Sequence, residues 1–96
     1  MPKYRVVFTT NAENDLKRIA KYLYDNDFDR EIVYKIRRES EKVLLKRAIG
    51  GILYDENRGI RKILIMRKNS VYYNIDGNKV NILHIRAGGM SEKIKM

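Results

Sequence analysis

The chain has 96 residues, contains no cysteine and carries a net charge of +9, from 21 Lys and Arg against 12 Asp and Glu. This length fits a single domain over residues 1–96, and a hydrophobic share of 44% predicts a folded globule with one modest core. The lack of cysteine excludes disulfides, thiolate metal sites and cysteine nucleophiles. The excess of cations indicates either a solvated, lysine-rich surface or a polyanionic partner, which is a nucleic acid or an acidic protein.

No segment has the pattern of a targeting or membrane-spanning sequence. The apolar run near the start, Val6 to Phe8, is too short for a secretory signal. No run approaches the roughly 20 apolar residues that cross a bilayer. We therefore expect a soluble, cytoplasmic protein without a membrane partner.

The N-terminal half begins with a predicted strand and helix. Tyr4 to Phe8 is β-branched and aromatic, which favours a strand. A helix is predicted from about Asn11 to Asp25, with Thr10 and Glu13 as a capping box at its start. Asp15 is assigned to the polar faces of this helix. Its apolar stripe is Ala12, Leu16, Ile19, Ala20 and Leu23.

A second helix is predicted to start at Asp29, which can cap it, and to end at Gly50-Gly51. The short polar break between the two helices makes them an antiparallel hairpin. Cations are concentrated toward the C-terminal end of the second helix, where the helix dipole favours them. Its basic stripe, which includes Arg37 and Arg38, is either a solvated face or a contact for an acidic partner segment.

The C-terminal half is predicted to be a loop followed by three strands. Leu53 to Gly59 is polar and rich in turn residues, so a loop is expected there. The strands are predicted at Ile60–Met66, Ser70–Ile75 and Val80–Arg86, with a hairpin turn at Asp76-Gly77. The order β-α-α-β-β-β predicts an α+β domain of two layers, in which the helix hairpin packs on one face of an antiparallel four-stranded sheet.

Three segments, in chain order, match the motifs of a known family. The opening YRVVFTTNAENDLKRIAKYL resembles a strand followed by A-x-x-D-L-x-x-I-x-x-Y, with Ala12, Asp15, Leu16, Ile19 and Tyr22 in the matching positions. GIRKILI over residues 59–65 is the second segment, and NSVYYNIDGNKVNILHIR over residues 69–86 resembles a tyrosine-bearing hairpin that closes on a strand ending near a His or Arg. In this order the segments resemble the RelE/ParE superfamily of toxins from type II toxin–antitoxin systems. Where that family often has a proline after the second helix, this chain has Ala48-Ile49-Gly50.

The resemblance covers nearly the whole chain and implies two alternative activities. RelE-like members cut messenger RNA on the ribosome, whereas ParE-like members bind DNA gyrase and block it. Members of both kinds are held silent by an antitoxin whose segment wraps the toxin. No cofactor, metal or small-molecule substrate is expected. A third interpretation is an inactive relative that only binds a partner.

An endoribonuclease needs a base, an acid and cations around the phosphate. Arg61, His84 and Arg86 are the candidates for these roles. His84 is the only histidine of the chain and is suited to acid/base work near neutral pH. It lies two residues from Arg86 on a predicted strand, so the two side chains share a sheet face.

The RelE-type set is incomplete, which favours a ParE-like toxin that acts by binding. Ile63 and Ser70 stand where the family has cations, and the tail AGGMSEKIKM has neither arginine nor tyrosine. Each missing donor removes about 3 kcal/mol of transition-state stabilisation. The segment NILHIRAGGM is similar to ParE-type endings, in which Leu-His is followed by Met, and in that interpretation His84 is structural. Candidate contacts for the target or the antitoxin are Tyr72, Arg86, Met90, Arg37 and Arg38.

Overall fold

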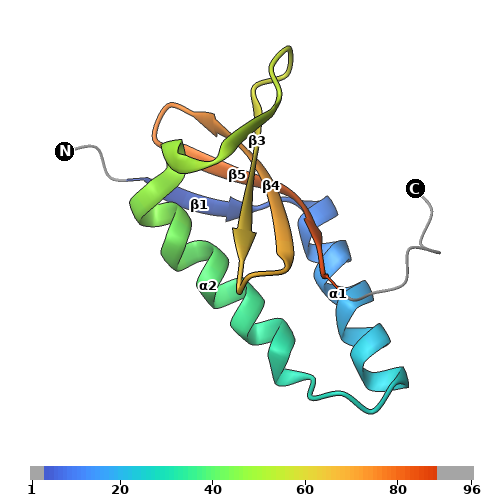
Figure 1. Ribbon diagram of the computed structural model, residues 1–96. Helices are drawn as coiled ribbons and strands as arrows, with labels where there is room; N and C mark the ends of the chain where they lie inside the picture. The colour runs from blue at the N-terminus through green and yellow to red at the C-terminus, as the bar shows by residue number, and fades with distance from the viewer. Residues whose placement is uncertain (1–3, 89–96) are drawn as a thin grey trace.

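The sheet of this protein has five strands in the order β1-β5-β4-β3-β2, as seen in a computed structural model that describes residues 4–88 (Figure 1). β1 runs parallel to β5, and all other neighbouring strands are antiparallel. The predicted α+β class is confirmed, but the sheet is mixed and has one strand more than predicted. The strands are β1 Arg5–Phe8, β2 Ile52–Asp55, β3 Ile60–Ile65, β4 Asn69–Asp76 and β5 Lys79–Arg86.

The extra strand is β2, so the expected loop over Leu53–Gly59 is wrong for its first residues. Ile52 and Leu53 pair with Lys62 and Arg61 of β3, and the register then shifts before Asp55. All of β2 except Asp55 is exposed, and a polar turn follows it. The β2–β3 hairpin projects at the top of Figure 1. A short, exposed strand beside a turn has the composition of a loop, which explains the error.

Helix α1, Thr10–Asp25, is capped by Thr9 rather than by Thr10. The Thr9 hydroxyl accepts from the Ala12 amide at 3.3 Å and donates to the Ile82 carbonyl at 2.7 Å, so the cap also joins the helix to β5. The predicted capping box is wrong in its second half, because the Glu13 carboxylate forms an ion pair with Arg37.

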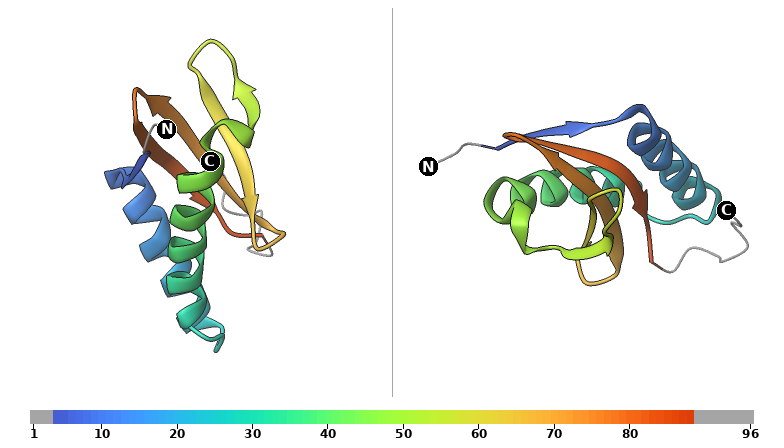
Figure 2. Two further views of the ribbon diagram at one scale, coloured as in Figure 1. Left: turned by 90° about the vertical axis from the view of Figure 1, so that its left-hand side faces the viewer. Right: turned by 90° about the horizontal axis from the view of Figure 1, so that it is seen from above.

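Helix α2, Glu31–Arg47, begins where the Asp29 carboxylate accepts a hydrogen bond from the Glu31 amide at 2.9 Å. It ends before the predicted Gly50-Gly51, because a short 3₁₀ turn, η1 Ala48–Gly50, connects it to β2. The left view of Figure 2 shows α1 and α2 side by side as the predicted hairpin. No helix within residues 4–88 is long and apolar enough to cross a membrane.

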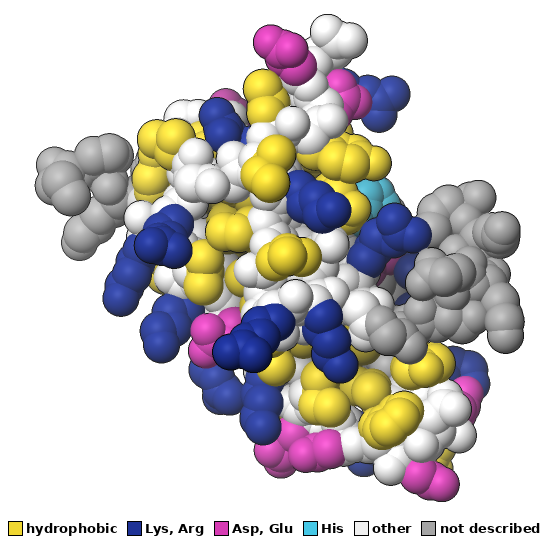
Figure 3. All heavy atoms as spheres, in the orientation of Figure 1, with side chains coloured by type: hydrophobic (Ala, Val, Ile, Leu, Met, Phe, Trp, Pro, Cys, Tyr) yellow, Lys and Arg dark blue, Asp and Glu magenta, His cyan; other side chains and the backbone are white. Residues whose placement is uncertain are grey.

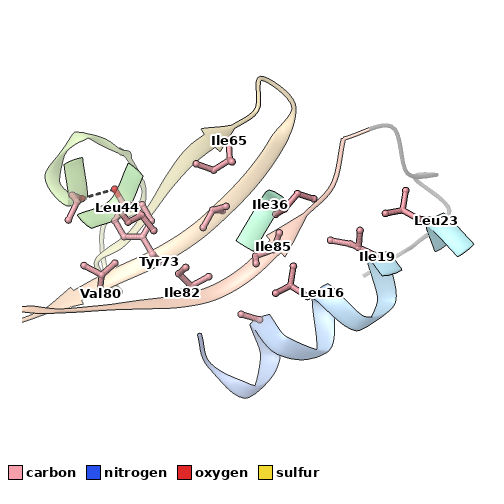
Figure 4. Packing of buried hydrophobic residues seen from close by; sticks show 13 residues of the cluster. Leu16, Ile19, Leu23, Ile36, Leu44, Ile65, Tyr73, Val80, Ile82 and Ile85 are labelled. Carbon is pink, nitrogen blue, oxygen red and sulfur yellow. Dashed lines mark hydrogen bonds between the residues drawn. The ribbon is translucent and has the colours of Figure 1, made fainter. Parts of the chain in front are cut away.

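Both helices contribute to one core on a single face of the sheet (Figure 4). A register shift places Tyr72 opposite His84 but Tyr73 opposite Ile82, so β5 has one extra residue, Leu83. This bulge lets both Ile82 and Ile85 face the core. The core residues are Ala12, Leu16, Ile19, Leu23, Ile36, Leu44, Ala48, Ile65, Val71, Tyr73, Val80, Ile82 and Ile85.

Tyr73 connects the sheet to the segment that leads into β2. Its hydroxyl donates to the Ala48 carbonyl at 2.7 Å (dashed line in Figure 4) and accepts from the Gly51 amide at 3.1 Å. A Cβ atom at Gly51 would lie 2.2 Å from this hydroxyl oxygen, so only glycine fits there. Burial raises the pKa of Tyr73 above its ordinary value, so the hydroxyl remains protonated and donating to a higher pH than that of an exposed tyrosine.

Replacing Tyr73 with phenylalanine should lower the free energy of unfolding by about 1–3 kcal/mol, because a buried carbonyl loses its donor. Urea denaturation followed by circular dichroism measures the change. Tyr72→Phe is the matched control, since the Tyr72 hydroxyl forms no hydrogen bond within residues 4–88. Equal losses for the two substitutions would contradict the role assigned to the Tyr73 hydroxyl.

Candidate functional site

An open hollow of about 570 Å³ lies on the sheet face opposite the core, and α1 borders it at one end. The histidine, in cyan in Figure 3, lies beside Lys and Arg side chains in dark blue. Side chains from α1, β2, β3, β4 and β5 line the hollow, together with the turns between these strands. Polar and aromatic residues among them are Asp15, Arg18, Tyr54, Asp55, Arg58, Lys62, Lys68, Ser70, Tyr72, His84 and Arg86.

Strand pairing places the outward residues of the hollow in rows across the sheet. Lys62, Tyr72 and His84 are paired neighbours on β3, β4 and β5. In the next row, Ser70 pairs with Arg86. The prediction that His84 and Arg86 share one sheet face is therefore confirmed.

Tyr72 and Tyr73 divide between the two faces of β4, as their alternation predicts. Tyr73 is fully buried in the core, whereas Tyr72 is half-buried and lines the hollow. The Tyr72 ring meets the Tyr54 ring edge-on, with 4.9 Å between centroids, and the Lys62 amine lies 5.9 Å from the Tyr72 centroid. These groups form a surface that is both aromatic and cationic.

The charge of the hollow is positive. Of its lining residues five are cations and two are carboxylates, which gives a formal charge of +3 (five minus two). One carboxylate, Asp55, is paired with Arg58 of the hollow at 3.6 Å, and the other, Asp15, with Arg18 at 2.9 Å. Such a surface suits an anionic group of a protein or a nucleic acid.

Asp15 of α1 holds His84 in place. One Asp15 carboxylate oxygen lies 3.2 Å from His84 Nδ1 and accepts from the Ile85 amide at 2.9 Å. The Asp15 side chain is 8% exposed, whereas that of His84 is 55% exposed. The assignment of Asp15 to a solvated helix face is therefore wrong. The carboxylate fixes one ring nitrogen of His84 and leaves the rest of the ring at the hollow.

Arg61 does not belong to the hollow. It pairs with Tyr73, on the helix-facing side of the sheet, and its guanidinium donates to the carbonyls of Gly51 at 3.0 Å and Ile49 at 3.3 Å. The structure thus separates Arg61 from His84 and Arg86, the other two candidates for nuclease chemistry. Arg61 holds the chain that enters β2.

The remaining predicted contact residues lie elsewhere. Arg37 is half-buried, pairs with Glu13 and stacks over the Phe8 ring at 4.5 Å from its centroid, so it joins α2 to α1 and β1. Arg38, next to it on α2, is exposed. Met90 lies outside the described residues.

Lys62, Tyr54 and Asp15 were not recognised as site residues in the sequence. Lys62 could have been predicted from the alternation of side chains along a strand. Lys62 pairs with Tyr72 and shares its sheet face, whereas Arg61 pairs with Tyr73 on the opposite face. Asp15 matches a position of the family motif, but its place outside the apolar stripe of the helix predicts a polar face. Within residues 4–88, no group of three or more His, Asp and Glu side chains could hold a metal ion.

The fold is that of small toxins from toxin–antitoxin complexes. The toxin–antitoxin complex RelBE2 from Mycobacterium tuberculosis matches at 22% identity and a TM-score of 0.67, over 88% of this chain and 98% of that one. A chain of the chromosomal ParDE system from P. aeruginosa matches at 22% identity and a TM-score of 0.70, over 92% and 99%. No curated protein matches the sequence.

The sequence itself identifies the family. Residues 6–92 match the family model of the ParE toxin of the type II toxin–antitoxin system parDE. The chain belongs to this family, and it is a toxin of a type II toxin–antitoxin system.

Replacing Asp15 with alanine should lower the free energy of unfolding by about 1–3 kcal/mol, because the Ile85 amide is left buried without an acceptor. Thermal and urea unfolding measure the loss. The control is Asp25→Ala on the same helix, which removes an exposed ion pair with Lys21 and should change stability by less than about 1 kcal/mol. Similar effects of both substitutions would show that Asp15 is only a surface charge.

Proposed function

We propose that this toxin arrests growth by binding DNA gyrase in the cytoplasm, and that a cognate antitoxin keeps it silent by covering it. The observation that carries the proposal is the match of residues 6–92 to ParE toxins. In this function the outward hollow, with its aromatic centre and positive rim, is the surface that meets the target. The toxin needs no catalytic group of its own.

The position of Arg61 supports binding over cleavage. Of the three residues that a nuclease would use, Arg61 donates to two backbone carbonyls on the helix side of the sheet. Without it, His84 and Arg86 lack one of the cations that would stabilise a phosphate in the transition state. The contact between His84 and Asp15 also gives this histidine a structural role.

Induction of the protein alone in bacteria should reduce thymidine incorporation before amino-acid incorporation within the first minutes. The physical reason is that blocked gyrase stops replication forks, while translation of existing messages continues. A supercoiling assay with purified gyrase and toxin provides the direct measurement. An earlier fall of protein synthesis would sink the gyrase proposal, and undisturbed growth would support an inactive relative that only binds a partner.

One observation favours ribosome-dependent cleavage of messenger RNA as a second candidate. His84 is oriented through Nδ1 by a nearly buried carboxylate, and Lys62, Lys68 and Arg86 line the same hollow. An oriented imidazole beside cations is an arrangement that can move a proton at a phosphate. In this function Lys62 takes the role that the sequence predicts for Arg61.

His84→Ala separates the two candidates. If the protein cleaves RNA, the substitution should reduce the cleavage rate by about 10²–10⁴-fold, because it removes the acid/base group. If the protein acts by binding gyrase, a folded His84→Ala protein should remain toxic. Primer extension on induced messages and growth curves report the two outcomes. Leu64→Ala, on the same sheet face, is the control for surface changes without loss of the histidine.

A further inference from the structure

The turn between β3 and β4, at the lower end of β3 in Figure 1, has a strained backbone. Ile65 pairs with Asn69 across the hairpin, so the turn consists of residues 66–68. Met66 has a φ of +55° and Arg67 a φ of +74°, both in the left-handed region. Turns with two successive positive φ angles strongly prefer asparagine, aspartate and glycine, because a larger side chain crowds the backbone there.

Met66 and Arg67 are the exceptions among the described residues with positive φ. The others are Gly59, Gly77 and Asp27, which belong to the residue types that tolerate this conformation. Asparagine and glycine at positions 66 and 67 would form the same turn with less strain. Backbone strain of this kind is concentrated at functional positions, where a particular side chain is needed in spite of its cost.

The surrounding structure holds the turn in this conformation. Asn69 is 2% exposed, and its side-chain amide donates to the Ile65 carbonyl at 3.1 Å. The side-chain oxygen of Asn69 accepts from the Gly88 amide at 3.3 Å. The Lys68 carbonyl packs so closely on Gly88 that a Cβ atom there would lie 2.3 Å from it. The turn is therefore fixed to the chain that follows β5, and a preformed turn loses little conformational freedom on binding.

The turn presents a methionine beside two cations. Met66 is 41% exposed, and Arg67 and Lys68 are exposed as well. Neither cation forms an ion pair within residues 4–88, and residues 60–75 contain no carboxylate. Lys68 also lines the hollow, so the turn continues the surface that the proposed function assigns to the target. Methionine and arginine are enriched at protein interfaces, and unpaired cations complement an acidic partner.

We infer that the turn over residues 66–68 recognises an acidic surface of the toxin's protein target, with Met66 in an apolar contact and both cations facing carboxylates. The strain is retained because asparagine and glycine would remove the side chains that make these contacts. A nucleic acid fits less well, since contacts to phosphates need the cations but not the methionine. The inference rests on the proposed function, in which gyrase is the target, and adds a specificity-determining element to it.

The double substitution Met66→Asn and Arg67→Gly relieves the strain and removes both side chains. It should raise the melting temperature by about 4–8 °C. It should nevertheless weaken growth arrest on induction, with at least about tenfold more surviving cells, because an interface contact is lost. Calorimetry and colony counts at equal protein levels measure the two changes. Met66→Leu with Arg67→Lys is the matched control, since it keeps the apolar group, the charge and the strain and should change neither property.

Two single substitutions separate a protein from a nucleic acid as the occupant. Met66→Asn keeps both cations and should weaken growth arrest, because the apolar contact is lost. Arg67→Glu should weaken it as well, because the new carboxylate faces an acidic surface. Lys21→Glu makes the same change of charge on α1, outside the hollow, and should leave growth arrest unchanged.

Full growth arrest by the double variant would overturn the inference, and so would a melting temperature that does not rise. An arrest that responds to Arg67→Glu but not to Met66→Asn would indicate a nucleic acid and would overturn it too. Growth arrest is measured whatever the target is, so these outcomes do not depend on the supercoiling assay. Toxicity without inhibition of gyrase would contradict the gyrase proposal alone.

Discussion

Only one face of the sheet is buried under the helix hairpin, and the two-residue period of a strand then decides which side chains can meet a partner. On β3 this constraint sends Arg61 toward the helices and Lys62 toward the hollow. Neighbouring residues of the same charge therefore have different roles. Arg61 donates hydrogen bonds to two backbone carbonyls, and Lys62 lies in the row of Tyr72 and His84 on the outward face. An error of one residue in register would exchange these roles.

Much of this arrangement was predictable from the sequence. The alternation of β-branched, aromatic and polar residues predicts the last three strands and places His84 and Arg86 on one sheet face. The bulge at Leu83 was not predictable, because strand register is set by tertiary contacts, and the Ile85 amide beside the bulge is bound by Asp15 of α1. No local pattern reports that a helix carboxylate will reach a strand amide 70 residues later.

β2 shows a second limit of sequence reasoning. Strand propensity reflects the burial and the neighbours of a side chain more than a preference of the backbone. The side chains of Ile52–Asp55 are mostly exposed, so the segment lacks the alternation of buried and exposed residues that marks a strand. Its strand conformation depends on pairing with β3 and on the hydrogen bonds that Tyr73 and Arg61 make to the chain before it. The sequence contains these residues, but only the folded chain brings them to the same place.

The hollow and the β2 edge are continuous at Tyr54. This residue lies on the edge strand and is 62% exposed, yet its ring also contacts Tyr72 at the centre of the hollow. A partner that covers β2 would therefore also cover Tyr54 and lie against the rim of the hollow at Arg58 and Lys62. If the hollow meets the cellular target, a partner at the edge would exclude that target by occupying shared surface and by neutralising shared charge. Silencing would then require no change in the fold of the toxin, only a partner that occupies the surface shared by β2 and the hollow.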